Sequence, residues 1–361
     1  MKKKLNTKDF NKFFHNKRIL ITGHTGFKGI WLSIILQSFG AKVYGFSLKE
    51  TSRIDNLRLF NLDKKIYTCY GDVVNKKPFF KYLNKVKPNI LFHLAAQPLV
   101  KESYVNPYDT FKTNVLGMLN VLEYAKISET LKSIVLITSD KCYKNKELSS
   151  GYSESDELGG DDPYSASKAA AEILFSSYNK SFFKKKNIGI ATARAGNVIG
   201  GGDWSNDRII PDTIKSIIDK KKLIIRSPNA VRPWQHVLEP LSGYIKLSYY
   251  LYNSKKQKFN GSWNFGPNLE KKVTVLNLIR LMIKNLNIKK KIIIQRNNKI
   301  KETIMLRLNC SKAKKQLNWK RLWNTSLSIQ KTSEWYKAYL EKKSVLEITK
   351  NQIKDYFKGG I

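Results

Sequence analysis

The sequence is poor in cysteine and in acidic residues, and it lacks a long apolar run. Only three cysteines occur in 361 residues, and neither they nor the four histidines have the spacing of metal ligands. We therefore expect reduced cysteines, no metal and a cytoplasmic location. The best apolar segment, Ile30–Phe39, is shorter than the roughly eighteen residues of a membrane span, so no span is expected. Met1–Lys17 is basic without an apolar core, which argues against a secretory signal.

The charge of the chain is strongly unbalanced. It carries 66 lysines and arginines against 28 acidic residues, a formal net charge of +38. Of the basic residues, 55 are lysines and 11 are arginines, spread along the whole chain. Because arginine is the usual reader of phosphates and base edges, we predict that nucleic acid is not a partner. The charge would still attract an anionic small molecule.

The first half alternates short apolar runs with amphipathic stretches such as Lys76–Val86 and Pro107–Ala125, the pattern of a parallel, doubly wound sheet. The predicted fold class is α/β, a Rossmann-like sheet followed by a smaller mixed α/β lobe. Strands are predicted at Arg18–Thr22, Lys42–Ser47, Ile66–Tyr70, Ile90–Leu94, Ile134–Thr138 and Ile188–Ala193.

The pattern becomes irregular after residue 196, where glycines and prolines accumulate. Predicted helices follow, including Thr274–Leu286 and Leu327–Leu340. We assign residues 1–195 to the sheet domain and expect the segment 230–265 to return to it. The smaller lobe is predicted to comprise 196–229 and 266–345, with a tail at 346–361.

A glycine-rich turn joins the first predicted strand to a helix. Glycines at every third position permit a tight turn and let the backbone approach a pyrophosphate at a helix amino-terminus. Tight turns of this kind need glycine anyway, so the position after the first strand matters more than the triplet itself. We predict a dinucleotide cofactor held by Gly23, Thr25, Gly26, Phe27, Lys28 and Gly29.

The choice between NAD and NADP stays open at this stage. NAD sites usually have an acid near the end of the second strand, and none stands at that position. Glu50 could hold the ribose, whereas Lys49 and Arg53 could meet a 2′-phosphate. After the third strand, Asp72 and Val73 are predicted to contact the adenine, although Asp72 could also be an ordinary turn residue.

The most informative stretch is an apolar strand that ends in Ser139, Asp140 and Lys141 and is followed by Tyr164 and Lys168. On a helix, the i, i+4 spacing places Lys168 beside Tyr164. We expect the ammonium to move the tyrosine pKa from about 10 toward neutrality. A phenol of this kind can take a proton from a hydroxyl while hydride leaves the same carbon.

The tyrosine–lysine spacing alone is weak evidence. With 18 tyrosines and 55 lysines, about three such pairs are expected by chance, and four occur. Only Tyr164 follows a strand that ends in serine and aspartate and also opens a helix. We therefore predict that only this pair belongs to a catalytic site.

Together these motifs resemble the extended short-chain dehydrogenase/reductases. The glycine turn and the Tyr164/Lys168 pair are typical of that whole superfamily. More specific motifs are similar to the sugar-nucleotide 4,6-dehydratases, in particular to the branch that acts on CDP-glucose. These are TSDKCY at 138–143, GGGDW at 200–204 and RPWQHV at 232–237.

The resemblance implies a redox-neutral dehydration of CDP-glucose to CDP-4-keto-6-deoxy-glucose, in which hydride passes from C4 to NAD+ and returns to C6. It implies that Tyr164, assisted by Lys168, removes the proton of the C4 hydroxyl. Ser139 would hydrogen-bond the C4 oxygen, and Asp140 would be the acid at C6. Lys141 stands where many dehydratases of other nucleotides carry a glutamate as the C5 base, so it is either that base or a surface charge.

The resemblance also implies further ligand contacts. The residues expected at the cofactor have packing explanations as well, since small and polar residues are common in such positions. Arginine suits a pyrophosphate because its planar fork makes paired charge-assisted bonds. The cofactor contacts are Ala95, Ala96, Gln97 and Asn114, and the substrate contacts are Asn197, Arg208, Arg232 and His236. For His236, a purely structural role is the alternative.

Two other functions remain open. The chain could be another sugar-nucleotide dehydratase or an epimerase, acting on a GDP-, dTDP- or UDP-sugar; Asp140 and Lys141 argue against an epimerase. It could also be a non-catalytic nucleotide sensor, although such proteins typically lose the tyrosine or the lysine. The resemblance further implies a homo-oligomer, a dimer or tetramer, and a role in deoxysugar synthesis for bacterial surface polysaccharide such as lipopolysaccharide O-antigen.

Overall fold

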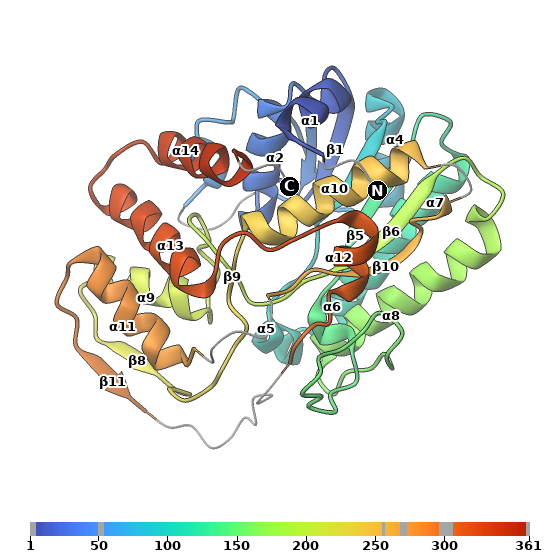
Figure 1. Cartoon of the computed structure of the whole chain (residues 1–361). Coiled ribbons are helices and arrows are strands. Elements are labelled where there is room, and N and C mark those ends of the chain that lie inside the picture. The colour runs from blue at the N-terminus through green and yellow to red at the C-terminus, as the bar shows by residue number, and fades with distance from the viewer. Residues whose placement is uncertain (1–4, 50–53, 255–256, 268–272, 296–305, 359–361) are drawn as a thin grey trace.

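A seven-stranded parallel sheet forms the centre of the computed structural model, which describes residues 5–49, 54–254, 257–267, 273–295 and 306–358 (Figure 1). The strand order is β10-β6-β5-β4-β1-β2-β3, and all pairs are parallel. This is the predicted doubly wound α/β class. The strands are β1 (Arg18–Thr22), β2 (Lys42–Ser47), β3 (Tyr67–Tyr70), β4 (Ile90–His93), β5 (Ser133–Ile137), β6 (Gly189–Arg194) and β10 (Gly261–Asn264).

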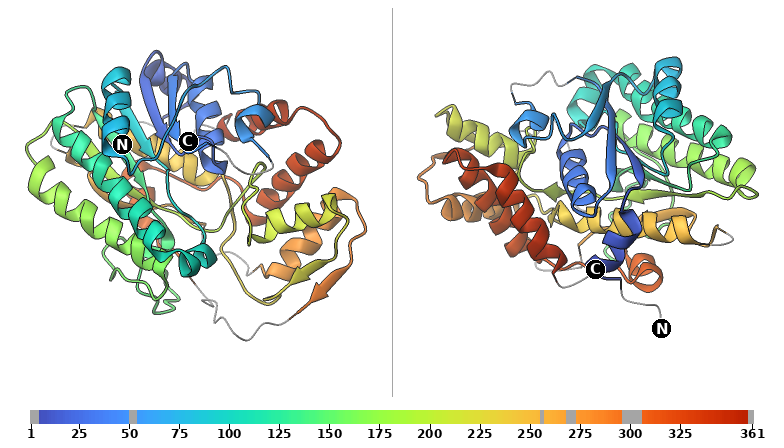
Figure 2. Two further views of the ribbon diagram at one scale, coloured as in Figure 1. Left: turned by 180° about the vertical axis from the view of Figure 1, so that it is seen from behind. Right: turned by 90° about the horizontal axis from the view of Figure 1, so that it is seen from above.

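Both faces of the sheet are covered by helices, which explains its continuous apolar strands. Successive side chains of a strand point to opposite faces. Thus Ile19 and Ile21 of β1 belong to one core cluster, and Leu20 between them belongs to the other. The first cluster includes residues of α1 (Thr7–Phe14), α2 (Phe27–Ser38), α10 (Leu238–Asn253) and α14 (Val345–Phe357). The second includes residues of α4 (Lys76–Val86), α7 (Gly117–Ile127) and α8 (Pro163–Tyr178), and Figure 2 shows this face from behind.

The helix predicted at Pro107–Ala125 is interrupted. It consists of α6 (Pro107–Phe111), a five-residue π-helical turn at Lys112–Leu116, and α7, and it is preceded by α5 (Val100–Val105). π turns inside helices are rare and often mark functional positions. Asn114 lies in this turn and is buried.

Helix α8 begins with strong local signals. Pro163 occupies the first turn, where a missing N–H costs nothing, and the Asp162 side chain accepts a hydrogen bond from the Ser165 N–H at 2.9 Å. These caps hold the amino end of the helix that carries Tyr164 and Lys168.

The second half adds β10 to the main sheet and also forms two small parallel strand pairs with their own helices. A parallel pair, β8 (Leu223–Ile225) and β11 (Ile292–Ile294), lies with α9 (Ile209–Ile218) and α11 (Val275–Leu286), while β7 (Val198–Ile199) pairs with β9 (Gln235–His236). Helix α13 (Thr325–Leu340) contacts α11, whereas α12 (Ser311–Leu317) contacts α10 and β10. The division into 1–195, 196–229 and 266–345 stays a prediction.

The remaining elements are short. They are α3 (Asn56–Leu59), a 3-10 turn at Asp140–Cys142 and a π turn at Asn179–Phe183. Of the helices that the structure describes, none has both the length and the apolar character needed to cross a membrane.

Candidate active site

Ser139 and Asp140 follow β5 directly, at the carboxyl edge of the sheet, and both are buried. The buried side chain of Tyr164 comes to the same point from the first turn of α8, close enough to Ser139 for that hydroxyl to lower the tyrosine pKa. The Tyr164 N–H donates to Ser103 Oγ at 3.1 Å, which fixes this end of α8 against α5. The structure therefore brings the predicted serine, aspartate and tyrosine together.

Each oxygen of the Asp140 carboxyl group has a neighbour. Ser139 Oγ donates to Oδ1 at 3.1 Å, and Asn197 Nδ2 lies 3.5 Å from Oδ2. Burial raises the pKa of Asp140 above its ordinary value, although Lys141, Ser139 and Lys28 act in the opposite direction. A carboxyl group with a raised pKa is suited to deliver a proton.

The predicted near-neutral pKa of Tyr164 is wrong for the protein by itself. Burial raises the pKa of this phenol to about 12, and the nearby Asp140 acts in the same direction. The Ser139 hydroxyl and the Arg208 guanidinium lower the pKa without outweighing burial. The i, i+4 spacing of Lys168 therefore does not produce a near-neutral phenol in the protein alone.

Lys168 itself is strongly affected by its surroundings. Its side chain is buried, and burial together with the charge of Lys28 lowers its pKa to about 8. Lys28 also has a pKa lowered to about 8, first by burial and then by Arg208, while Asp140 and Asp203 act to raise it. Lys28, which is predicted to contact the cofactor, therefore also interacts electrostatically with Asp140 and Arg208.

A buried ion pair connects α8 to the sheet. Glu172, one turn after Lys168, lies 2.7 Å from Arg194 Nη2 and also accepts hydrogen bonds from Thr138 and Thr192. Burial alone would raise the pKa of Glu172, but Arg194 and these hydrogen bonds lower it below its ordinary value. The carboxylate is thus held ionised beside the lysine, and it acts to raise the Lys168 pKa.

The turn after β1 fits a dinucleotide. Gly23 has φ +70°, and a Cβ there would lie 2.8 Å from the Ala95 nitrogen, so only glycine allows this close approach of the two strands. Helix α2 begins at Phe27 with the exposed Gly26 as its N-cap and no side-chain cap. The N–H groups of its first turn are therefore available to a phosphate. The residues present fit the pyrophosphate of NAD.

Residues for the adenosine end are only partly described. Glu50 and Arg53, which could distinguish NAD from NADP, lie outside the described residues, and Lys49 is exposed. Asp72 follows β3, and its Oδ1 accepts the Val74 N–H at 3.0 Å, as a turn residue does. Val73 is buried, and its carbonyl accepts from Asn120 at 2.9 Å.

Asn114 connects the cofactor side to the catalytic helix. Its Oδ1 accepts the Gln97 N–H at 2.9 Å, and its Nδ2 donates to Ser167 Oγ at 2.9 Å. The Gln97 side chain bonds back to Leu99 and Thr110, so it stabilises its own loop. Ala95 and Ala96 are half-buried after β4. These four residues lie at the expected edge of the sheet, and their contact with a cofactor stays a prediction.

Of the predicted substrate residues, Arg208 and Asn197 lie near Tyr164 and Asp140, whereas the described contact of Arg232 is with its own neighbour in the chain. Arg208 pairs with the buried Asp203 at 2.9 Å and lies near Tyr164, while Asn197 reaches Asp140. Arg232 is half-buried and donates to its neighbouring Val231 carbonyl at 3.2 Å.

His236 is the exception among the predicted substrate contacts. It is fully buried between Trp31 and Trp323, with ring centroids 5.4 and 4.8 Å away. Burial lowers its pKa to about 3. The structure supports the alternative of a packed, neutral histidine, and the predicted contact with the nucleotide is corrected accordingly.

Sequence reasoning missed Asp203 and Glu172. Asp203 is part of the GGGDW motif, and the available signal was an acid five residues before the arginine with which it pairs. Glu172 follows Lys168 by four residues on one helix, a spacing that puts both on the same face. Its partner Arg194, on β6, is distant in sequence.

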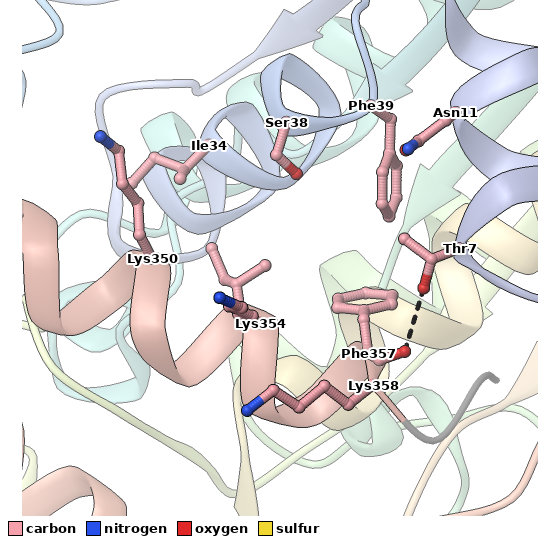
Figure 3. A pocket seen from close by; sticks show the side chains of 10 residues that line it. Thr7, Asn11, Ile34, Ser38, Phe39, Lys350, Lys354, Phe357 and Lys358 are labelled. Carbon is pink, nitrogen blue, oxygen red and sulfur yellow. Dashed lines mark hydrogen bonds between the residues drawn. The ribbon is translucent and has the colours of Figure 1, made fainter.

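A separate pocket of about 280 Å³ lies between α1, α2 and α14 (Figure 3). Its walls include Phe39 and Phe357, and the lysines of α14 stand at its rim. Its lining contains none of the predicted site residues. We therefore place the reaction at the carboxyl edge of the sheet and not in this pocket.

A family model described as GDP-mannose 4,6 dehydratase matches residues 20–332. The chain belongs to this family of extended short-chain dehydrogenase/reductases. Among relatives, it is 41% identical over 349 residues to a CDP-glucose 4,6-dehydratase of Salmonella typhimurium, covering 95% of this chain and 97% of the relative. It is 26% identical to a CDP-paratose 2-epimerase of Salmonella typhi, covering 73% and 83% of the two chains.

Solved structures of similar fold also come from this dehydratase and epimerase group. A dTDP-glucose 4,6-dehydratase from Streptomyces venezuelae with bound NAD has a TM-score of 0.76 at 20% identity, covering 91% of this chain and 99% of the other. An epimerase from Methanothermobacter thermautotrophicus has a TM-score of 0.80 at 20% identity, covering 93% and 96%. At this identity the likeness concerns the fold.

Proposed function

We propose that the protein is an NAD-dependent hydro-lyase that converts CDP-glucose to CDP-4-keto-6-deoxy-glucose and water. The observation that carries the proposal is the meeting of Tyr164, Ser139 and Asp140 at the carboxyl edge of the sheet. The substrate is proposed from the 41% identical relative, whose name specifies CDP-glucose.

In this reaction Tyr164 accepts the proton of the C4 hydroxyl, and Ser139 hydrogen-bonds the C4 oxygen. NAD held at the turn of residues 23–29 would supply the acceptor and later the donor of one hydride, and its positively charged oxidised ring would favour the phenolate. Lys168 stabilises the same anion from the next turn of α8. Because burial holds the Tyr164 pKa at about 12, these neighbouring cations are required for proton removal.

Loss of water needs an acid at C6 and a base at C5. Asp140, with its raised pKa, gives its proton to the C6 oxygen as the C6–O bond breaks. We propose Lys141, half-buried beside Asp140, as the group that receives the C5 proton. Hydride returns to C6 and a proton to C5, so the sugar is rearranged without net oxidation.

The diphosphate of the substrate is proposed to bind Arg208, Arg232 and Asn197. Asp203 holds the Arg208 guanidinium at 2.9 Å, which leaves its other N–H groups for phosphate oxygens. The formal net charge of +38 favours the approach of this anion. No nucleic acid or membrane is proposed as a partner.

A homo-oligomer, a dimer or tetramer, is proposed to form through the surface of α6, the π turn, α7 and α8. Exposed apolar side chains on these elements support it, because an interface would remove them from water. They are Tyr108, Phe111, Leu116, Ile127 and Ile173. The proposed setting is the bacterial cytoplasm, where the product would enter deoxysugar synthesis for surface polysaccharide such as O-antigen.

One assay tests the proposed function. The purified protein is incubated separately with CDP-glucose, dTDP-glucose, UDP-glucose and GDP-mannose, without added NADH. We expect a keto-sugar from CDP-glucose alone. Conversion of another nucleotide instead would refute the substrate, and no conversion of any would favour a non-catalytic, nucleotide-sensing protein.

A further inference from the structure

Gly196 has no room for a side chain, because the Asp140 carboxyl group occupies that space. A Cβ built on Gly196 would lie 1.8 Å from Asp140 Oδ2, 2.1 Å from its Cγ and 2.2 Å from its Oδ1. All three distances are far below van der Waals contact. The whole carboxyl group therefore rests where a Cβ would have to be.

The backbone at Gly196 and Asn197 is held by hydrogen bonds, which limit how far it can move. The Gln235 side-chain amide, fully buried, donates to the Gly196 carbonyl at 3.1 Å and to the Phe265 carbonyl at 3.0 Å. The Gln235 N–H also donates to the Asn197 carbonyl at 3.1 Å. A Cβ at position 196 would therefore displace the carboxyl group and not the glycine.

The next residue completes the arrangement. Asn197 has φ +53°, a left-handed conformation that asparagine adopts more readily than most residues. This turn of the chain leaves Gly196 under the carboxyl group while the Asn197 side chain reaches Oδ2 at 3.5 Å. Ser139 holds the other oxygen. The space at Gly196, the Asn197 amide and the Ser139 hydroxyl together define one orientation of the Asp140 carboxyl group.

We propose that Gly196 is a positioning residue for Asp140. Because Gly196 has no side chain, it leaves a space, called the seat below, that holds the Asp140 carboxyl group toward C6 of the sugar. This inference rests on the proposed function, in which Asp140 is the acid of water loss. Removing the seat affects one step selectively. Tyr164 still takes the C4 proton, whereas the C6 oxygen no longer receives a proton as the C6–O bond breaks and the C5 proton leaves.

The test is a double-mutant cycle of wild type, Gly196→Ala, Asp140→Ala and the double variant, with CDP-glucose as substrate. We expect Gly196→Ala to lower kcat by about 10- to 1000-fold, the range of a misdirected general acid. The near-ultraviolet absorbance of reduced cofactor should accumulate, because C4 oxidation continues ahead of water loss. In the Asp140→Ala background the carboxyl group is gone, so Gly196→Ala should lower kcat no further. Gly159→Ala is the matched control, since a Cβ there meets only the Lys144 side chain and backbone, at 3.2 Å or more.

A measurement without substrate separates this inference from the proposed function. Urea unfolding of the four proteins should show that Gly196→Ala destabilises wild type but has little effect on Asp140→Ala. If wild type converts no CDP-glucose, the proposed function fails. The urea unfolding of the four proteins still tests whether Gly196 makes room for the Asp140 carboxyl group. Failure of Gly196→Ala to fold, with a folded double variant, would support the seat. Wild-type kcat in Gly196→Ala, or equal losses in both backgrounds, would overturn it.

Discussion

Glu172 and Arg194 form an ion pair at 2.7 Å in which the two side chains are only 0% and 3% exposed. The pair joins α8, which carries Tyr164 and Lys168, to β6 in the sheet. Thr138, at the end of β5, donates to the same carboxylate. One acidic side chain therefore connects α8, β5 and β6, two of which lead to the proposed catalytic groups.

Glu172→Gln is expected to destabilise the protein by about 3–5 kcal/mol, because it leaves the buried Arg194 charge without its partner. The free energy of unfolding in urea measures this loss. Glu347→Gln is the control, since Glu347 and Lys350 are 64% and 52% exposed and such a surface pair contributes at most about 1 kcal/mol. Equal losses in both variants would show that the buried pair has no special importance.

Tyr164→Phe should abolish ketone formation while the fold is kept. The substitution removes one hydroxyl from a buried ring and leaves the packing of α8 intact. We expect kcat for CDP-glucose to fall at least about 100-fold, the contribution of a proton-transfer group. Circular dichroism and a melting temperature near that of wild type confirm folding, and undiminished turnover would contradict the role of the phenol.

Stability should rise with pH in the weakly alkaline range. Lys28 and Lys168 have pKa values of about 8 when folded, against an ordinary 10.5, so above pH 8 the unfolded chain binds more protons than the folded one. The folded Tyr164 pKa of about 12, raised from 10.0 by burial, opposes this trend above pH 10. Lys168→Met should therefore flatten the rise in unfolding free energy between about pH 8 and pH 10. A rise as steep as in wild type would mean that Lys168 is not the source.

The two glycines of the phosphate turn should behave differently on substitution. Gly23→Ala forces a strained φ of +70° and a 2.8 Å contact with Ala95, so we expect a loss of about 1–3 kcal/mol in stability. Gly26→Ala meets only the Gly23 carbonyl at 3.5 Å and should be nearly as stable as wild type. Both should bind NAD more weakly in calorimetry. Unchanged NAD affinity in Gly26→Ala would place the pyrophosphate elsewhere.

The fold was predictable where the signal was local. All six predicted strands are present with ends shifted by no more than one residue, because each is an apolar run between turn residues. The strand Gly261–Asn264 was not predicted, since its four residues, Gly-Ser-Trp-Asn, have no apolar pattern. Helix α14 fell in the predicted tail, although Ser344 caps it and Ile353 packs inside.

The neighbourhood of some candidate residues was predictable, but their electrostatics were less so. Tyr164, Ser139 and Asp140 lie together as the sequence motifs suggested, whereas a catalytic role for them and for Lys168 stays a prediction. The pKa of a phenol depends on its burial, and burial is a tertiary property. For the same reason His236 looked like a ligand contact, whereas aromatic rings from distant parts of the chain enclose it. The contact of Asp140 with Gly196 likewise joins separate segments.

Helix α2 begins at the phosphate turn, and its Trp31 Nε1 donates to the Gly201 carbonyl at 2.8 Å. The segment that contains Gly201 also carries Asn197 and Asp203, so helix α2 connects the turn proposed to bind NAD with the segment proposed to bind the sugar nucleotide. A ligand bound at one end of this connection should therefore affect the binding of a ligand at the other end. Dinucleotide and nucleotide sugar should therefore associate cooperatively, each tightening the grip on its companion.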